Sequence, residues 1–246
     1  MFTKITNVFL DIMFPPICLG CKEHLEKRNE FICAACLGSI KLNNTLFCPV
    51  CQVRLAENKK ICNHGPEKNM QFPYLLAAAT NYDSQIIQNL IHYYKYKNFN
   101  EISNTLGNIL IEYLWFTFEN SKLIRQLADE NYSVAYIPLH FIRENTRGFN
   151  QSKLLAQIIS KNFNLELVDA LIRIKNNPPQ AKLRNHNERQ KSISNAFQIA
   201  NPDKIKNKNI ILLDDVHTSG ATMSEAAKIL KQNGANKIIA LVIAKA

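Results

Sequence analysis

The sequence lacks long hydrophobic runs. No segment of its 246 residues approaches the roughly 20 consecutive apolar residues that a membrane-spanning helix needs. The stretch 1–16 also lacks the small-residue cleavage site of a signal peptide, and its polar positions are not rich in Lys or Arg. Its apolar spacing predicts an amphipathic helix that packs against the rest of the chain. We therefore expect a cytoplasmic protein with no stable membrane insertion.

Acidic residues are scarce relative to basic ones. The chain has 20 Asp and Glu residues against 30 Lys and Arg residues, which gives a formal net charge of +10. Such an excess favours binding to a polyanion, a class that includes nucleic acid, membrane headgroups and phosphorylated small molecules. The alternative is that the excess charge only keeps the protein soluble.

Cysteine is absent beyond residue 62, and the number of cysteines up to and including that residue is odd. All 7 lie in three Cys-x-x-Cys pairs and one Cys-x-His element. An odd count does not suit a disulfide framework, whereas seven thiols and one imidazole supply enough ligands for two tetrahedral zinc ions. The candidate metal ligands are Cys18, Cys21, Cys33, Cys36, Cys48, Cys51, Cys62 and His64.

The spacing of these ligands leaves the number and pairing of the zinc sites open. Neighbouring elements can share an ion, or alternate elements can interleave. The Cys62-x-His64 element is shorter than the three pairs, so we expect one or two structural zinc ions. The segment is too short to build much core of its own, and bound metal would supply its folding energy.

Apolar runs alternate with helical patterns after residue 72. Apolar runs predict strands at 74–83, 134–138, 210–213 and 237–244. Apolar residues at helical spacing predict helices at 84–97, 100–119, 150–162 and 222–233. This alternation indicates an α/β fold with a mostly parallel sheet flanked by helices. We expect a zinc-binding domain at 1–72, an α/β domain at 73–246 and, within it, a long basic loop at 173–191.

The stretch IILLDDVHTSGATM, residues 210–223, combines two kinds of ligand group. The turn after Asp215 offers backbone N–H groups and hydroxyls at a helix N-terminus, where phosphate binds readily. Asp214 and Asp215 suit sugar hydroxyls and attract magnesium. The stretch therefore predicts a pocket for a ribose 5-phosphate. The alternative is a capped helix after a strand, but two buried acids without partners would cost stability.

Within this stretch, LLDDVHTSGAT resembles the phosphoribosyl-pyrophosphate (PRPP) signature of type I phosphoribosyltransferases. The segments at 90–98, 137–152 and 177–197, with the Cys-x-x-Cys repeats, look like the ComF family, the competence proteins of natural transformation. The resemblance covers nearly the whole chain and implies a type I phosphoribosyltransferase-like sheet behind a small N-terminal zinc-ribbon domain. It departs from the family at Asn98, where Gly is expected, and at Cys62-x-His64, where a Cys pair is usual.

The resemblance also implies roles for individual residues. The acid pair would hold the ribose hydroxyls, directly or through magnesium, and would be the catalytic carboxylates if the enzyme is active. The 5-phosphate would lie against Thr218, Ser219, Gly220, Ala221 and Thr222. Pyrophosphate would be contacted by Arg143, Arg147, Gln180, Arg184 and Arg189. His140 is a candidate acid or base, or a surface residue after Pro138.

ComF-type proteins are associated with moving incoming single-stranded DNA, often beside a helicase-like partner. Single-strand binding needs a basic groove with aromatic side chains for stacking, and both kinds of residue occur close together here. The candidates are Tyr93, Lys95, Lys97, Arg147 and Phe149. The alternative is that Tyr94 faces the core and the neighbouring aromatics are ordinary surface residues.

Three functions fit these features. The first is a competence protein for DNA uptake that binds PRPP and single-stranded DNA. The second is an active phosphoribosyltransferase of nucleotide metabolism, although no pocket for a base or amine acceptor is recognisable. No glutaminase domain precedes the fold, which argues against a complete glutamine amidophosphoribosyltransferase. The third is a zinc-ribbon interaction module on a degenerate enzyme fold, which the intact acid pair and phosphate loop argue against.

Overall fold

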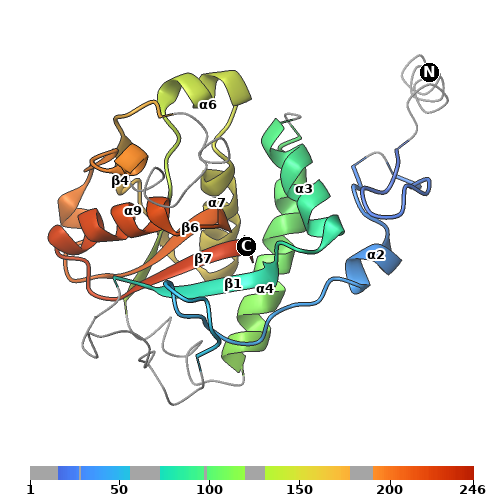
Figure 1. Cartoon of the computed structure of the whole chain (residues 1–246), viewed down its shortest axis with the longest axis horizontal. Coiled ribbons are helices and arrows are strands. Elements are labelled where there is room, and N and C mark those ends of the chain that lie inside the picture. Colours follow the sequence, from blue (N-terminus) through green and yellow to red (C-terminus); the bar gives the residue numbers. More distant parts are fainter. Residues whose placement is uncertain (1–15, 28, 56–72, 97–98, 120–130, 178–190) are drawn as a thin grey trace.

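The structure is a computed structural model that describes residues 16–27, 29–55, 73–96, 99–119, 131–177 and 191–246 (Figure 1). The amphipathic helix expected at the start of the chain lies outside these residues. So do the predicted site residues Cys62, His64, Lys97, Gln180, Arg184 and Arg189. In the described part of the chain, no helix is both long and apolar enough to cross a bilayer.

A five-stranded sheet forms the centre of the molecule, in the order β1-β7-β6-β2-β3. Every pairing between these strands is parallel, which confirms the predicted α/β fold. The strands are β1 (Leu75–Asn81), β2 (Tyr132–Tyr136), β3 (Glu166–Leu167), β6 (Asn209–His217) and β7 (Ile238–Lys245). The middle strands β6 and β7 are almost entirely buried, as expected of apolar runs covered on both faces.

Helices cover the two faces of the sheet unequally (Figure 1). One face carries α3 (Gln85–Tyr96), α4 (Ile102–Glu119) and α7 (Gln151–Phe163). The other carries α9 (Ala221–Gln232) and a two-stranded antiparallel sheet of β4 (Leu171–Arg173) and β5 (Phe197–Ile199). Three short helices complete the description, α2 (Ala34–Gly38), α6 (Phe141–Arg147) and the 3-10 helix η2 (Pro202–Lys204).

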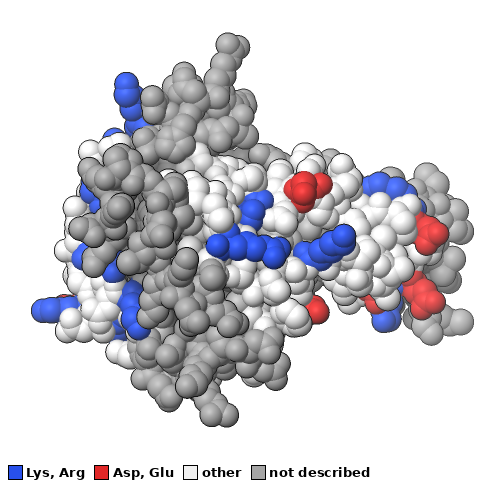
Figure 2. Space-filling model, turned by 60° about the horizontal axis from the view of Figure 1, so that its bottom comes forward, with Lys and Arg blue, Asp and Glu red and all other residues white. Residues whose placement is uncertain are grey.

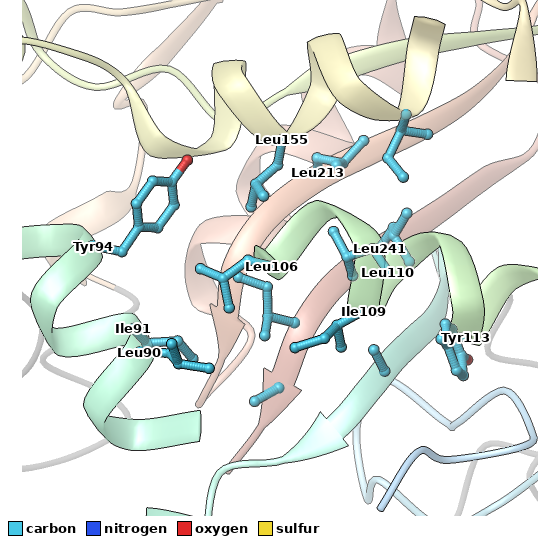
Figure 3. Close-up of a cluster of buried hydrophobic side chains, with 14 of the residues drawn as sticks. Leu90, Ile91, Tyr94, Leu106, Ile109, Leu110, Tyr113, Leu155, Leu213 and Leu241 are labelled. Carbon is cyan, nitrogen blue, oxygen red and sulfur yellow. The ribbon is translucent and has the colours of Figure 1, made fainter. Parts of the chain in front are cut away.

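The three-helix face holds a continuous apolar core (Figure 3). Helix α4 packs closely on α7, and Gly107 shows how closely. A Cβ at this position would lie only 2.8 Å from Cγ2 of Ile158, so a larger residue would not fit without a shift. Tyr94 is fully buried on α3, and its hydroxyl donates to the carbonyl of Gln151 on α7 at 2.8 Å. These contacts fix α3 and α7 relative to each other, and both helices reach the end of β6.

The end of β6 corrects the sequence analysis. The strand was expected to stop at Leu213, but it continues to His217 because its pairing with β7 continues to Lys245. On its other side, pairing with β2 stops at Tyr136 opposite Leu213. The two acids therefore lie within the strand, at the point where one neighbouring strand has already turned away.

The connections after β2 and β6 run on opposite faces of the sheet. The chain leaves β2 toward α7 on one face, and it leaves β6 toward α9 on the other. Adjacent strands whose connections diverge in this way leave a crevice at their carboxyl ends, where ligands of open α/β sheets bind. The fold thus places a binding crevice between β2 and β6.

The predicted basic loop at 173–191 is partly regular structure. Its first residue, Arg173, ends β4, which pairs with β5 beyond the loop. Each strand has only 3 residues, which is too short for an alternating pattern to indicate a strand.

Residues 43–47 cover the exposed edge of β1. Phe47 exchanges two backbone hydrogen bonds with Leu76, at 2.7 and 3.2 Å, and Asn43 donates to the carbonyl of Ala79 at 2.8 Å. The cysteine-rich segment also contacts α3, where the Asn89 side chain donates to the carbonyl of Leu19 at 2.7 Å. The cysteine-rich segment is therefore fixed against the sheet rather than tethered beside it.

Candidate functional site

The two acids of β6 face different partners. Asp215 is 9% exposed and forms an ion pair with Lys95 of α3, with 2.9 Å between Oδ1 and Nζ. Burial lowers the pKa of Lys95, but the Asp215 carboxylate raises it by more, so Lys95 is held as a cation. Lys95 was assigned to nucleic acid in the sequence analysis, and the structure places it beside the acid pair.

Asp214 accepts two hydrogen bonds at one oxygen. The Ser152 hydroxyl donates to Oδ1 at 3.0 Å, and the backbone N–H of Asp215 donates to the same atom at 2.9 Å. Burial and the charge of Asp215 raise the pKa of Asp214 to about 7, and Lys95 and the two donors offset part of that rise. The second carboxyl oxygen accepts no hydrogen bond from the described residues.

The loop after β6 packs closely on side chains behind it. Gly220 has φ 72°, in the left-handed region, and α9 begins at the next residue. A Cβ on Gly220 would lie 2.9 Å from Nε2 of His217 and 3.0 Å from the hydroxyl of Tyr74. Those two atoms are themselves 3.0 Å apart, so a bonded pair supports the loop from behind.

The hydroxyl of Ser219 is buried and has no hydrogen-bond partner among the described residues. Such groups carry a desolvation cost and are normally satisfied by a ligand or water. A pocket lies beside this loop, and it is lined by Asp214, Val216, His217, Thr218, Gly220, Ala221, Thr222 and Met223. One pocket therefore joins an acid of β6 to the helix N-terminus.

Burial lowers the pKa of His217 to about 4, so its ring is neutral. Burial also raises the pKa of Tyr74 to about 12. The Tyr74–His217 contact is thus a hydrogen bond between two neutral groups, and it adds no charge to the loop that it supports.

The segment after β2 ends at the same edge of the sheet. The backbone N–H of Ile137 still donates to the carbonyl of Leu213 at 2.9 Å, which places the following residues beside Asp214. His140 is 8% exposed and caps α6, because its ring accepts from the backbone N–H of Ile142 at 3.4 Å. The structure thus gives His140 a structural contact, and its role as acid or base stays a prediction.

The predicted arginines of α6 lie in different surroundings. Arg143 donates to the carbonyl of Asn177, at the start of the basic loop. Arg147 donates to the side chain of Gln151 at 3.1 Å. The structure adds Arg173, which is 9% exposed with its guanidinium 5.6 Å from the ring centre of Phe197.

Arg173 was not predicted as a site residue. Burial and the charge of Arg143 lower its pKa to about 10, and the charge of Asp214 offsets part of that fall. These influences place the two arginines and Asp214 in one electrostatic neighbourhood. No sequence signal singles out Arg173, because its surroundings come from segments far apart in the chain.

The aromatic candidates for nucleic-acid stacking pack within the protein. Tyr93 lies against Phe99 with 6.1 Å between ring centres, and Phe99 in turn contacts Phe31 at 5.8 Å. Phe149 packs against Tyr94 at 5.6 Å. Tyr94 faces the core, as the alternative in the sequence analysis had it. Tyr93 and Phe149 are half-buried, and their role in nucleic-acid binding stays a prediction.

Four cysteines meet in one cluster, formed by Cys18, Cys21, Cys33 and Cys36. Their sulfur atoms all lie within 4.8 Å of one another, with 3.8 Å between Cys21 and Cys33, and none forms a disulfide. Zinc–sulfur bonds of about 2.3 Å require tetrahedral sulfur–sulfur distances of about 3.8 Å. The cluster therefore fits a zinc ion, and neighbouring elements share the site.

Backbone donors prepare this cluster for a cation. Burial raises the pKa of Cys18, but the N–H groups of Cys33, Cys21 and Gly20 together lower it by more, to about 6. The hydrogen bond with Cys33, desolvation and the thiols of Cys21 and Cys18 together raise the pKa of Cys36 to about 12. Four thiolates cannot ionise together without a positive charge between them, so this donor set calls for a metal.

Cys48 and Cys51 form a second turn of the same kind, in which the backbone N–H of Val50 donates to Cys48 Sγ at 3.4 Å. Their predicted companions, Cys62 and His64, lie outside the described residues.

Removal of one ligand tests the four-cysteine cluster. Cys36→Ser should lower the zinc content by one ion per chain, measured by atomic emission on the purified full chain. Ser39→Ala is the matched control, because Ser39 only donates to the carbonyl of Cys36. Equal zinc content in wild type and Cys36→Ser would show that the cluster does not hold the metal.

Removal of the cation beside the acid pair should change the titration of Asp214. Lys95 lowers the pKa of Asp214 from a value that burial sets high, so Lys95→Met should move it upward from about 7. Carboxyl carbon chemical shifts measured against pH would report this. Lys208→Met is the control, because Lys208 pairs with Glu166 at the opposite end of β6. An unchanged or lower pKa for Asp214 in Lys95→Met would contradict the prediction.

The same shift fixes the sign of a stability effect. The pKa of Asp214 rises from 3.8 to about 7 on folding, so the folded state binds more protons than the unfolded state in that window. The contribution of Asp214 to stability is therefore most favourable below pH 3.8 and is lost as the pH rises through about 7.

Two family matches cover most of the chain. Residues 9–64 match the double zinc ribbon domain, and residues 120–246 match the phosphoribosyl transferase domain. The second match spans slightly over half of the sequence. The strands and loop of the candidate site after residue 131 all lie within it.

Similar proteins extend over both regions. DNA utilization protein YhgH of Escherichia coli (strain K12) is 29% identical over 222 residues, which is 90% of this chain and 93% of that protein. Competence protein F of Haemophilus influenzae is 25% identical over 93% of this chain and 96% of its own length. Competence protein ComFC of Bacillus subtilis is 25% identical over 85% of this chain and 82% of its own. These relatives confirm the resemblance drawn from the motifs, and the chain belongs to the phosphoribosyl transferase domain family, with a match to the double zinc ribbon domain ahead of that domain.

Proposed function

We propose that this protein binds PRPP at the carboxyl end of β6 and uses that site in DNA uptake, together with single-stranded DNA. The observation that carries the PRPP proposal is the pocket that is lined by Asp214 and, in the loop that follows, by Thr218, Gly220, Ala221 and Thr222. A sugar phosphate needs acceptors for its hydroxyls and donors for its phosphate, and this pocket presents both.

The 5-phosphate would lie at the N-terminus of α9. Backbone N–H groups and the helix dipole favour an anion there, and the buried Ser219 hydroxyl supplies a donor that has no partner among the described residues. The ribose hydroxyls would lie against the free oxygen of Asp214. Bound magnesium would be held by the acid pair and would neutralise part of the pyrophosphate charge.

Pyrophosphate would face the segment after β2. Arg173 is nearly buried, and the charges of both Arg143 and Asp214 act on it. Two cations close together in a partly buried place repel each other, and a bound polyanion would offset that repulsion. This supports the assignment of Arg143 to pyrophosphate and adds Arg173 to it.

Neutralising one acid tests the PRPP proposal. Asp214→Asn should weaken PRPP binding about tenfold or more, since a hydrogen bond to a charged group contributes about 1.5–3 kcal/mol, while inorganic phosphate should bind as before. Calorimetry with and without magnesium would measure both. Asp214 is preferred to Asp215, whose loss would leave Lys95 buried without its counter-charge.

The control for this experiment is Asp169→Asn, which removes an exposed carboxylate that pairs with Lys153 at 3.7 Å. Equal PRPP affinity in wild type and Asp214→Asn would remove the ribose assignment. Loss of phosphate binding together with PRPP binding would instead indicate that the substitution disturbs the loop.

The DNA part of the proposal is supported by the relatives and by charge. The relatives are named for DNA utilization and for competence, and the chain carries a net charge of +10. Figure 2 shows basic side chains in a row across the middle of one face. Acidic side chains lie mostly toward the end of the molecule that holds the cysteine-rich segment. Such a row suits a phosphate backbone.

Binding to single-stranded DNA should depend steeply on salt. Three neutralised phosphates would lower the affinity about twentyfold between about 50 and 200 mM salt, measured by fluorescence anisotropy with a labelled oligonucleotide. Arg147→Gln should reduce the salt slope by about 0.7 if Arg147 contacts one phosphate. Lys161→Gln on the far end of α7 is the control. A flat salt response would contradict the basic-surface proposal.

Phosphoribosyl transfer is a second candidate function, and one observation favours it. Asp214 has a pKa of about 7, so it can accept a proton at neutral pH, as a general base must. In the transfer, the bond from the anomeric carbon to pyrophosphate breaks with its electron pair leaving on pyrophosphate. A nitrogen acceptor bonds to that carbon and gives its proton to the carboxylate.

A further inference from the structure

The cysteine-rich segment contains the same turn twice. In the first turn the backbone N–H of Lys22 donates to the carbonyl of Cys18 at 3.0 Å, and Cys18 N–H donates to Glu23 at 2.8 Å. In the second, Gln52 donates to Cys48 at 2.9 Å, and Cys48 N–H donates to Val53 at 3.0 Å. The two turns therefore share the same backbone hydrogen bonds and differ only in their side chains.

Lys22 and Gln52 occupy equivalent positions with φ of 69° and 57°. The Lys22 side chain turns back onto its own turn, where Nζ donates to the carbonyl of Leu19 at 3.4 Å. The Gln52 side chain leaves its turn and donates from Nε2 to the carbonyl of Thr218 at 3.1 Å. This contact joins the second cysteine turn to the phosphate loop across 166 positions of sequence.

The position of Gln52 is set by the sheet rather than by a flexible tether. The residue before the turn, Phe47, pairs with Leu76 on the edge of β1. The ammonium of Lys245, at the end of β7, lies 4.8 Å from the ring centre of Phe47. The turn that carries Gln52 is therefore anchored to β1 and to β7, and β7 is the strand that pairs with the end of β6.

The geometry of a peptide unit gives this contact a consequence. In a trans peptide the C=O and the following N–H point in opposite directions. A bond that holds the Thr218 carbonyl toward Gln52 therefore turns the N–H of Ser219 away from Gln52. That N–H makes no backbone hydrogen bond within the described part of the chain, and the Ser219 hydroxyl has no partner there either.

We propose that Gln52 is a positioning residue for the phosphate loop: by fixing the Thr218 carbonyl, it aims the Ser219 N–H at a bound phosphate and makes the second cysteine turn an outer wall of the site. The proposal rests on the proposed function, because the loop must bind a phosphate for its orientation to matter. Gln52 contacts the loop from the cysteine-rich segment, whereas Tyr74 and His217 contact it from the sheet side.

Gln52→Met tests the proposal, because it removes the donor and keeps the length of the side chain. Lys22→Met is the matched control in the equivalent turn. The probes are PRPP and inorganic phosphate, titrated against the full chain and followed by the amide resonances of Ser219 and Gly220. Gln52→Met should weaken both ligands by the same factor, about fivefold, and Lys22→Met should change neither.

An equal loss of affinity for PRPP and for inorganic phosphate distinguishes the effect of Gln52 from that of the acid pair. Asp214→Asn should lower the affinity for PRPP alone. Hydrogen exchange in the ligand-free chain gives a readout that does not depend on binding. Exchange at 218–220 should be faster in Gln52→Met than in wild type or Lys22→Met.

Unchanged exchange and unchanged affinity in Gln52→Met would overturn the proposal. If wild type binds neither probe, the proposed function fails, and the exchange measurement alone then decides whether Gln52 orders the loop. A fall in PRPP affinity without a fall in phosphate affinity would also overturn the proposal, since Gln52 would then act on the ribose half of the site.

Discussion

Two neighbouring carboxylates near the end of an apolar strand repel each other, and the structure around them is arranged to offset that repulsion. Asp215 has the Lys95 ammonium at 2.9 Å, and Asp214 has the Ser152 hydroxyl and a backbone N–H. Lys95 and Ser152 come from α3 and α7, the helices that Tyr94 joins through its bond to α7. The packing of one face of the sheet is thus tied to the charge of the site.

The loop half of the candidate site has a different origin. Its loop follows from the continued pairing of β6 with β7, from the left-handed Gly220 and from the Tyr74–His217 pair behind it. The two halves meet because β2 leaves the sheet one residue before the acids while β7 does not. Loss of one neighbouring strand opens the pocket, and retention of the other keeps the loop in place.

The sequence was most informative where a pattern is local. Apolar periodicity located the long strands and helices, and regular cysteine spacing predicted the cluster that residues 18–36 form. The end of β6 was misplaced because charged residues look like a strand end unless pairing with β7 is known. The ion pair of Lys95 with Asp215 was not foreseen, because a helical pattern shows which residues share a face and not what lies opposite. Arg173 and Gln52 were missed because their contacts join distant segments.

The strand order has a consequence for biosynthesis. β7 lies between β1 and β6 in the sheet, yet it follows both in the chain. While the chain leaves the ribosome, β1 has only residues 43–47 beside it until residue 245 is made. The cysteine-rich segment can thus shield an otherwise exposed strand edge from other chains. The pairing of β6 with β7, which extends β6 up to the loop that follows it, likewise forms only after β7 has been made.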